Sequence, residues 1–168
     1  RQNRLNDDIT TSLASSIQNW NQILKIELIL KQNCIEYLGV SSLATALTKC
    51  SNLQILKLLI GENRIGDQGF QTLGCSLAKC KNLYALILDI SENFIYDDSS
   101  VQILGQALKN NSKLQNLVLI FGIDYCYDDG IYGSEGIGVN SISSAQREKF
   151  RKQILQMKTL VFKRIEFY

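Results

Sequence analysis

Residues 53–82 read LQILKLLIGENRIGDQGFQTLGCSLAKCKN, and this stretch decides the fold. In its first half, Leu53, Leu56, Leu58 and Ile60 end in a period of two, which predicts a short strand with one buried face. Its second half places Phe70, Leu73 and Leu77 three and four residues apart, which predicts one stripe of an amphipathic helix. The polar run between the two halves suits a turn. One strand–turn–helix–turn unit is therefore predicted.

The same unit recurs every 30 residues on both sides of this stretch. Asparagines mark the repeat at Asn3, Asn33, Asn63 and Asn93, and several apolar columns keep the same spacing. One residue inserted after Asn93 shifts the next columns to a spacing of 31. A unit of this size cannot bury both its strand and its helix, so neighbouring units must stack to form a core. We therefore predict an α/β fold, a curved solenoid with parallel strands on one side and helices on the other.

The unit resembles a leucine-rich repeat of the ribonuclease-inhibitor type, with an LxLxxNxI core and a DxG that opens the helix. The resemblance covers residues 1 to about 121. The long unit, rich in Asn, Gln, Ile and Lys with a Cys closing the helix, resembles the expanded repeat proteins of ciliates. The resemblance implies a leucine-rich-repeat solenoid, a right-handed α/β horseshoe arc with strands on the concave face and helices on the convex face.

The resemblance also implies a ladder of asparagine side chains that bond backbone groups in the turns. Asn33, Asn63 and Asn93 are expected to carry this structural role, as does Asn3 if its unit is complete. Asp124 stands in the fourth place by spacing. An ionised carboxylate accepts hydrogen bonds but donates none, so we expect the ladder to weaken there.

We expect residues 1–146 to form about four repeats, the first partial and the last irregular, with an insertion near 122–138. Residues 147–168 are predicted to add a capping helix and a last strand, with Ser143 or Ser144 as the N-cap of that helix. The capping segment carries a net charge of +5, from seven basic and two acidic residues, whereas residues 82–146 carry −6, from eight acidic and two basic. A basic patch for an acidic protein or nucleic acid is one interpretation, but we favour a solvated cap, because no aromatic stacking platform accompanies the charges.

The alternate residues of each strand are predicted to face outward on the concave face, in two lateral rows. Five of the eight residues in these rows are apolar, and an exposed apolar patch usually marks a partner-binding site. An alternative is that these side chains only pack against one another. The candidate partner-binding residues are Glu27, Lys57, Ile87 and Val118 in one row and Ile29, Leu59, Asp89 and Ile120 in the next. The five apolar residues are expected to act as anchors, and the three charged ones to set specificity.

Catalytic, metal and cofactor chemistry find no support in the sequence. The chain has no His, which excludes the usual triads, His-ligated zinc and the commonest general base. Its five Cys form no CxxC pair, and we interpret them as reduced, buried structural thiols, of which Cys50 and Cys80 share one repeat position. The segment 121–138 has neither the ligand spacing of a calcium loop nor the pattern of a phosphate-binding loop. We expect no catalytic residue, no metal, no cofactor and no small-molecule substrate.

The predicted function is protein–protein interaction, as a scaffold or structural subunit of a larger intracellular assembly. A cytoplasmic location is expected, because no signal peptide is recognised and no apolar run reaches the ~18 residues of a membrane span. The likeness to ciliate proteins alone implies a ciliary or cytoskeletal setting. Nucleic acid is not expected as a partner, since the net charge is only +2. The alternative, a GTPase regulator of the Ran GTPase-activating protein type, rests on fold analogy.

Overall fold

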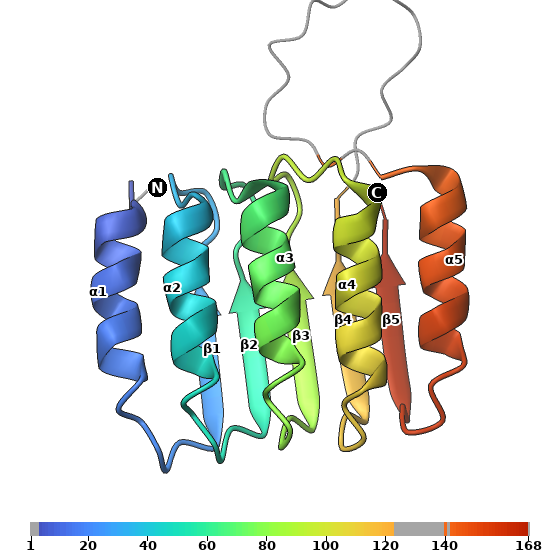
Figure 1. Cartoon of the computed structure of the whole chain (residues 1–168), viewed down its shortest axis with the longest axis horizontal. Helices are drawn as coiled ribbons and strands as arrows, with labels where there is room; N and C mark the ends of the chain where they lie inside the picture. Colours follow the sequence, from blue (N-terminus) through green and yellow to red (C-terminus); the bar gives the residue numbers. More distant parts are fainter. Residues whose placement is uncertain (1–3, 123–139, 141, 168) are drawn as a thin grey trace, which may run out of the picture.

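The computed structural model describes residues 4–122, 140 and 142–167, and over this part of the chain five strands alternate with five helices (Figure 1). The helices are α1 (Asp7–Ile17), α2 (Tyr37–Leu47), α3 (Gly66–Leu77), α4 (Asp98–Lys109) and α5 (Ser144–Leu155). The strands are β1 (Lys25–Ile29), β2 (Ile55–Leu59), β3 (Ala85–Asp89), β4 (Asn116–Ile120) and β5 (Phe162–Glu166). The predicted alternation of strand and helix, and with it the α/β class, is confirmed.

The five strands form one parallel sheet in sequence order, β1-β2-β3-β4-β5. The repeat period sets the register directly, because Lys57 pairs with Glu27 and Ile87 across steps of 30 residues. The step from β3 to β4 is 31 residues, and Ile87 pairs with Val118. The step to β5 is longer, since Val118 pairs with Arg164. Equal positions of successive units therefore lie side by side on the sheet.

All five helices lie on one face of the sheet, in a single row in which each helix packs on the next (Figure 1). The inward alternate residues of the strands, such as Leu56 and Leu58, are fully buried between the sheet and this row. Gly69 of α3 permits close packing on α2, because a Cβ built there would lie 2.7 Å from Cγ1 of Val40. The other face of the sheet carries no helix in the described part of the chain.

Polar side chains cap the starts of α1, α4 and α5, whereas α2 and α3 begin without a side-chain cap. The side-chain oxygens of Asn6, Asp97 and Ser143 accept hydrogen bonds from backbone N–H groups in the first turns of α1, α4 and α5. Ser143 is thus the N-cap of the last helix, one of the two predicted residues. Acidic residues link one helix start to the next, since Asp67 Oδ1 accepts from the N–H of Asp97 at 2.8 Å and Asp98 Oδ1 from that of Ser143 at 2.9 Å.

An asparagine side chain holds the turn that follows each of the strands β1 to β4, and Asn63 after β2 is the clearest case. Asn63 Oδ1 accepts a hydrogen bond at 3.0 Å from the N–H of Ile35, in the preceding unit. Its Nδ2 donates to the carbonyls of Leu30 at 2.9 Å, Ile60 at 2.9 Å and Gly61 at 3.1 Å. One amide therefore satisfies backbone groups of two neighbouring units, which buried polar backbone requires.

Two more asparagines repeat this geometry. Asn33 Oδ1 accepts from the N–H of Leu5 at 2.9 Å, and Asn93 Oδ1 lies 3.4 Å from the nitrogen of Ile65. Both also donate to carbonyls of their own strand ends or of the unit before. Asn3, the first residue expected in the ladder, lies outside the described residues.

Asn140 occupies the next rung of the ladder. Its Oδ1 accepts from the N–H groups of Asn93 at 2.9 Å and Ile95 at 3.0 Å. Its Nδ2 donates to the carbonyls of Ile90 and Phe121, each at 2.7 Å. The side chain is fully buried and makes four hydrogen bonds. These are the bonds expected of the ladder residue that follows Asn93.

The rung assigned by spacing to Asp124 is therefore filled by Asn140. In the unit 53–82, Asn63 donates to the carbonyl of Ile60, which lies three residues earlier in the chain. Asn140 donates to the equivalent carbonyl, that of Phe121, which lies 19 residues earlier. Sixteen additional residues, 19 less 3, thus stand between the end of β4 and the rung. Asp124, and the predicted insertion 122–138 apart from Gly122, lie outside the described residues. The division into repeats 1–146 and a cap 147–168 stays a prediction.

An aromatic cluster fills the core between the last units. Phe121 stacks on Phe167 with ring centroids 4.7 Å apart, and it contacts Phe150 edge-on at 5.5 Å and Phe70 at 6.3 Å. Phe70, Phe121 and Phe150 are completely buried. Such edge-on and stacked pairs add to the hydrophobic contribution of each ring. The cluster joins α3, α5 and the ends of β4 and β5 into one core.

Candidate functional site: the open sheet face

The face of the sheet turned away from the helices is the candidate site, and we call it the open sheet face. The alternate residues of the five strands lie on it in three lateral rows, in the registers given above. The rows are Lys25, Ile55, Ala85, Asn116 and Phe162; then Glu27, Lys57, Ile87, Val118 and Arg164; then Ile29, Leu59, Asp89, Ile120 and Glu166. All eight predicted partner-binding residues therefore fall in the second and third rows.

The five predicted anchors form a continuous apolar area across β1 to β4. Ile29, at the edge of the sheet, is 62% exposed. Leu59, Ile87, Val118 and Ile120 are half-buried by their neighbours on adjacent strands. A half-buried β-branched or leucine side chain packs laterally on the pleated surface and still presents apolar atoms outward. Both of the interpretations offered by the sequence, lateral packing and an exposed apolar surface, thus apply to the same residues.

Charged residues border the apolar area at the β1 side. Lys57 Nζ lies 2.6 Å from Oε1 of Glu27, and Lys25 Nζ lies 3.7 Å from Oε2 of the same carboxylate. The hydrogen bond and positive charge of Lys57 hold the pKa of Glu27 below its ordinary value of 4.5. The interaction therefore exists above about pH 4.5 and is lost as the pH falls through the lowered pKa of Glu27. At neutral pH two lysines therefore share one ionised carboxylate at this border.

Asp89 lies in the third row as predicted, but its carboxylate is used inside the chain. The residue is only 3% exposed. Its Oδ1 accepts from the backbone N–H and the hydroxyl of Ser91, and its Oδ2 accepts from Lys31 Nζ at 2.8 Å. Lys31 reaches β3 from the end of β1 by passing Gly61, where a built Cβ would lie 3.1 Å from the Lys31 Cε. We therefore assign Asp89 to the strand-end turn, and not to the contact surface.

The first row was missing from the prediction, although its signal was present in the sequence. Ile55 stands two residues before Lys57 of a predicted row and is 38% exposed, so the period-two pattern extended by one step would have found it. Phe162, which is 50% exposed, lies on β5, and the predicted rows did not include that strand. Arg164 and Glu166 of β5 form an ion pair at the far border, and they enter the site because β5 pairs with β4.

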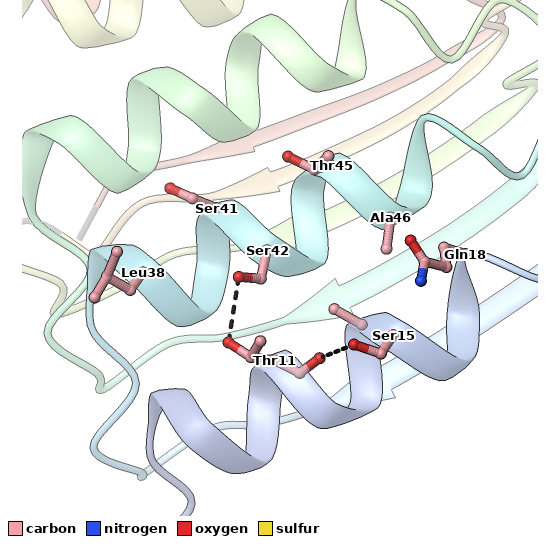
Figure 2. A pocket seen from close by; sticks show the side chains of 9 residues that line it. Thr11, Ser15, Gln18, Leu38, Ser41, Ser42, Thr45 and Ala46 are labelled. Atoms are coloured by element: carbon pink, nitrogen blue, oxygen red, sulfur yellow. Dashed lines mark hydrogen bonds between the residues drawn. The ribbon is translucent and has the colours of Figure 1, made fainter.

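The helix side of the molecule contains a groove of about 360 Å³ between α1 and α2. Figure 2 shows the hydroxyl groups of Thr11 and Ser42 facing each other across it, with the hydroxyl oxygens 3.2 Å apart. The Ser15 hydroxyl donates to the backbone carbonyl of Thr11 at 3.0 Å. The nine lining residues are uncharged. This groove holds no group suited to acid–base or nucleophilic chemistry at neutral pH.

The cysteines divide into two classes. Cys50 and Cys80 are buried as predicted, each with its sulfur near carbonyl oxygens of its own helix and of the preceding unit. For Cys34 and Cys75 the prediction of burial is wrong, because Cys34 lies in the turn after β1 and Cys75 on the exposed side of α3. Burial raises the pKa of Cys50. Burial is also the larger cause at Cys80, and together with the charge of the neighbouring Cys50 it raises the pKa of Cys80 to about 11. In the described part of the chain, no three His, Cys, Asp or Glu side chains gather as a possible metal site. Cys126 lies outside that part.

This division predicts the order in which the thiols react with iodoacetamide in the native protein near pH 8. We expect rapid modification of Cys34 and Cys75, and protection of Cys50 and Cys80 until the protein is unfolded, because only an accessible thiolate is nucleophilic. Peptide mapping by mass spectrometry after timed labelling measures each site. Modification of Cys80 at the rate of Cys75 under native conditions would show that the predicted burial is wrong.

No helix in the described residues combines the length and apolarity needed to cross a lipid bilayer. No protein-family model matches the chain, and no curated protein sequence gives a significant match. Among solved structures, the chain is similar to leiomodin-1 actin-binding site 2, with a TM-score of 0.63 and 15% sequence identity. The alignment covers 93% of this chain and 78% of that one. The likeness concerns the fold alone, and together with the parallel sheet and its helices it is compatible with a leucine-rich-repeat fold.

Proposed function

We propose that this chain is a protein-binding module that holds its partner against the open sheet face. The observation that carries the proposal is the apolar area formed by the half-buried Leu59, Ile87, Val118 and Ile120 and continued by Ile29 at the sheet edge, on a face that no helix of the described residues covers (Figure 1). A contiguous apolar area of this kind on an open surface marks an interaction site. Lys57 with Glu27 on one side, and Arg164 with Glu166 on the other, supply a polar rim.

The role we propose is that of a scaffold or structural subunit in a cytoplasmic, cytoskeletal assembly, without catalytic activity. The structural neighbour, leiomodin-1 actin-binding site 2, is named for its binding of actin, which makes actin the first partner to test. A ciliary setting is a narrower form of the same proposal. We also propose that the units are leucine-rich repeats of the ribonuclease-inhibitor type, related to those of ciliates, and that their stack curves with the open sheet face inside the arc.

The test measures binding to actin, by cosedimentation with filaments and by fluorescence titration with monomers. In the double variant Ile87→Thr and Val118→Thr, the apolar centre becomes polar while β-branched side chains preserve the strands. We expect binding to weaken about tenfold or more, because truncation at the centre of an interface commonly has effects of this size. Circular dichroism and thermal unfolding establish that the variant retains the fold.

The matched control replaces two apolar residues on the helix side. Leu38 of α2 and Leu155 of α5 are 54% and 61% exposed, and the variant Leu38→Ser and Leu155→Ser should bind as the wild type does. Equal loss in both variants would contradict a contact on the open sheet face. If wild-type protein fails to bind actin, the same two variants are tested in crosslinking with native extract, in which the open-face variant alone should lose its crosslinks. Acceleration of GTP hydrolysis by a candidate GTPase would instead favour the regulator.

A further inference from the structure

The helix side carries a second groove, between α4 and α5, that differs in charge from its counterpart at the other end of the row. It encloses about 670 Å³. Among the described residues, its walls carry three lysines and several glutamines, and none of the residues that line it is acidic. The residues that matter here are Gln102, Gln106 and Lys109 of α4 and Lys149, Lys152 and Gln153 of α5. The groove between α4 and α5 therefore brings three positively charged side chains together on one concave surface.

The strand registers show that these residues occupy the same repeat positions as the lining of the groove between α1 and α2. Lys109, Lys149 and Lys152 correspond to Gln18, Ser42 and Thr45. The fold therefore makes a groove at both places, but fills only one of them with positive charge. The charge is a property of this pair of helices and not of the architecture.

Little of this charge is neutralised within the molecule. Among the described residues, Lys109 and Lys149 make no ion pair, and Lys152 contacts Glu148 at 3.4 Å in an exposed pair of one helix. Exposed pairs of that kind contribute little energy. Ammonium groups that converge on a groove raise the local concentration of anionic groups.

The glutamines make the groove suited to a polypeptide. Gln102 Nε2 donates to Gln146 Oε1 at 3.2 Å and so joins the two helices. Gln153 lies over Gly105, where a built Cβ would come within 2.6 Å of its Oε1, so its amide is positioned by close packing of α5 on α4. Carboxamides both donate and accept hydrogen bonds, as peptide main chain requires.

Two features argue against nucleic acid in this groove. Arginine side chains bind phosphate in a bidentate manner. Both arginines of α5 make other contacts, since Arg147 Nε donates to the carbonyl of Ile142 and Arg151 lies over the ring of Phe167. In the part of the chain that the structure describes, no aromatic side chain lines the groove to stack on a base. We propose that the groove between α4 and α5 binds an acidic segment of a second protein, on the side of the molecule opposite the open sheet face.

The test measures fluorescence anisotropy with a labelled peptide of alternating Glu and Ala, about a dozen residues long, which as a helix would span roughly 18 Å. Wild-type protein should bind it at low ionic strength, with affinity falling as salt is added. The triple variant Lys109→Gln, Lys149→Gln and Lys152→Gln should lose about tenfold or more in affinity. The double variant Ile87→Thr and Val118→Thr should bind the peptide as wild type does, so the failure of either proposal is distinguishable from that of the other.

The matched control removes the same charge elsewhere, with Lys49→Gln, Lys79→Gln and Lys81→Gln, all exposed positions near the ends of α2 and α3. This variant should keep its affinity within about twofold of wild type, if the groove rather than net charge binds the peptide. An equal loss in both triple variants would overturn the proposal, as would the absence of wild-type binding. Displacement of the peptide by oligothymidylate of equal charge at lower concentration would assign the groove to nucleic acid and also overturn it.

Discussion

Replacing Asn140 by alanine is expected to lower the free energy of unfolding by about 3 kcal/mol or more. The Asn140 amide makes four hydrogen bonds, with the N–H groups of Asn93 and Ile95 and the carbonyls of Ile90 and Phe121. Alanine would leave these backbone groups buried without a partner, and each unsatisfied group destabilises the folded state by about 1–3 kcal/mol. Urea unfolding followed by circular dichroism measures the effect.

The control is an asparagine that lies on the surface. Asn110, at the end of α4, is exposed and accepts one hydrogen bond from Gln106 Nε2. The variant Asn110→Ala should change the free energy of unfolding by less than about 0.5 kcal/mol. If Asn140→Ala and Asn110→Ala unfold at the same urea concentration, Asn140 is not a rung of the ladder.

Replacing Phe121 by alanine is expected to lower the free energy of unfolding by about 4 kcal/mol. The ring is completely buried and contacts three other rings, those of Phe70, Phe150 and Phe167. Removing the ring loses the hydrophobic free energy of its burial and also leaves a cavity that the surrounding side chains fill only in part. Because α5 and β5 are joined to the earlier units through these contacts, hydrogen exchange in α5 should also become faster.

The conservative variant Phe121→Leu keeps most of the volume and should lose less than half as much stability as Phe121→Ala. Phe94→Ala is a second control, since Phe94 is only half-buried and its ring contact within the described residues is with Tyr96, at 6.5 Å. An effect at Phe94 as large as that at Phe121 would contradict the central place of Phe121 in the core.

The regular part of the molecule was predictable because each unit places the same types of residue at the same positions to bury its strand and helix and to bond its turn. The period of 30 placed Asn33, Asn63 and Asn93 correctly, and it aligned the strands in the observed register. Two periodicities within a unit were enough to separate strand from helix. Even β5, in a segment without a ladder asparagine of its own, was visible as an alternating run.

The rest depended on contacts that no period encodes. Asn140 was not predicted because 16 additional residues interrupt the repeat spacing, and the uninterrupted spacing led to Asp124 instead. Asp89 was placed on the right row, but its carboxylate bonds to Ser91 and to Lys31, which is 58 residues away, and no repeat period encodes that contact. The uneven charge of residues 147–168 was visible, whereas the groove that gathers Lys149 and Lys152 with Lys109 required the packing of α5 on α4.

The hydrogen bond from Asn140 to the carbonyl of Phe121 has a consequence for how this chain can change. It fastens together two points that are 19 residues apart along the backbone, at the carboxyl end of β4. The packing of the units on either side therefore does not depend on the number of residues between Phe121 and Asn140. Closure entropy grows only with the logarithm of that length, by about 0.6 kcal/mol per doubling. This end of β4 is thus a place where the protein can acquire or exchange whole segments while its scaffold stays intact.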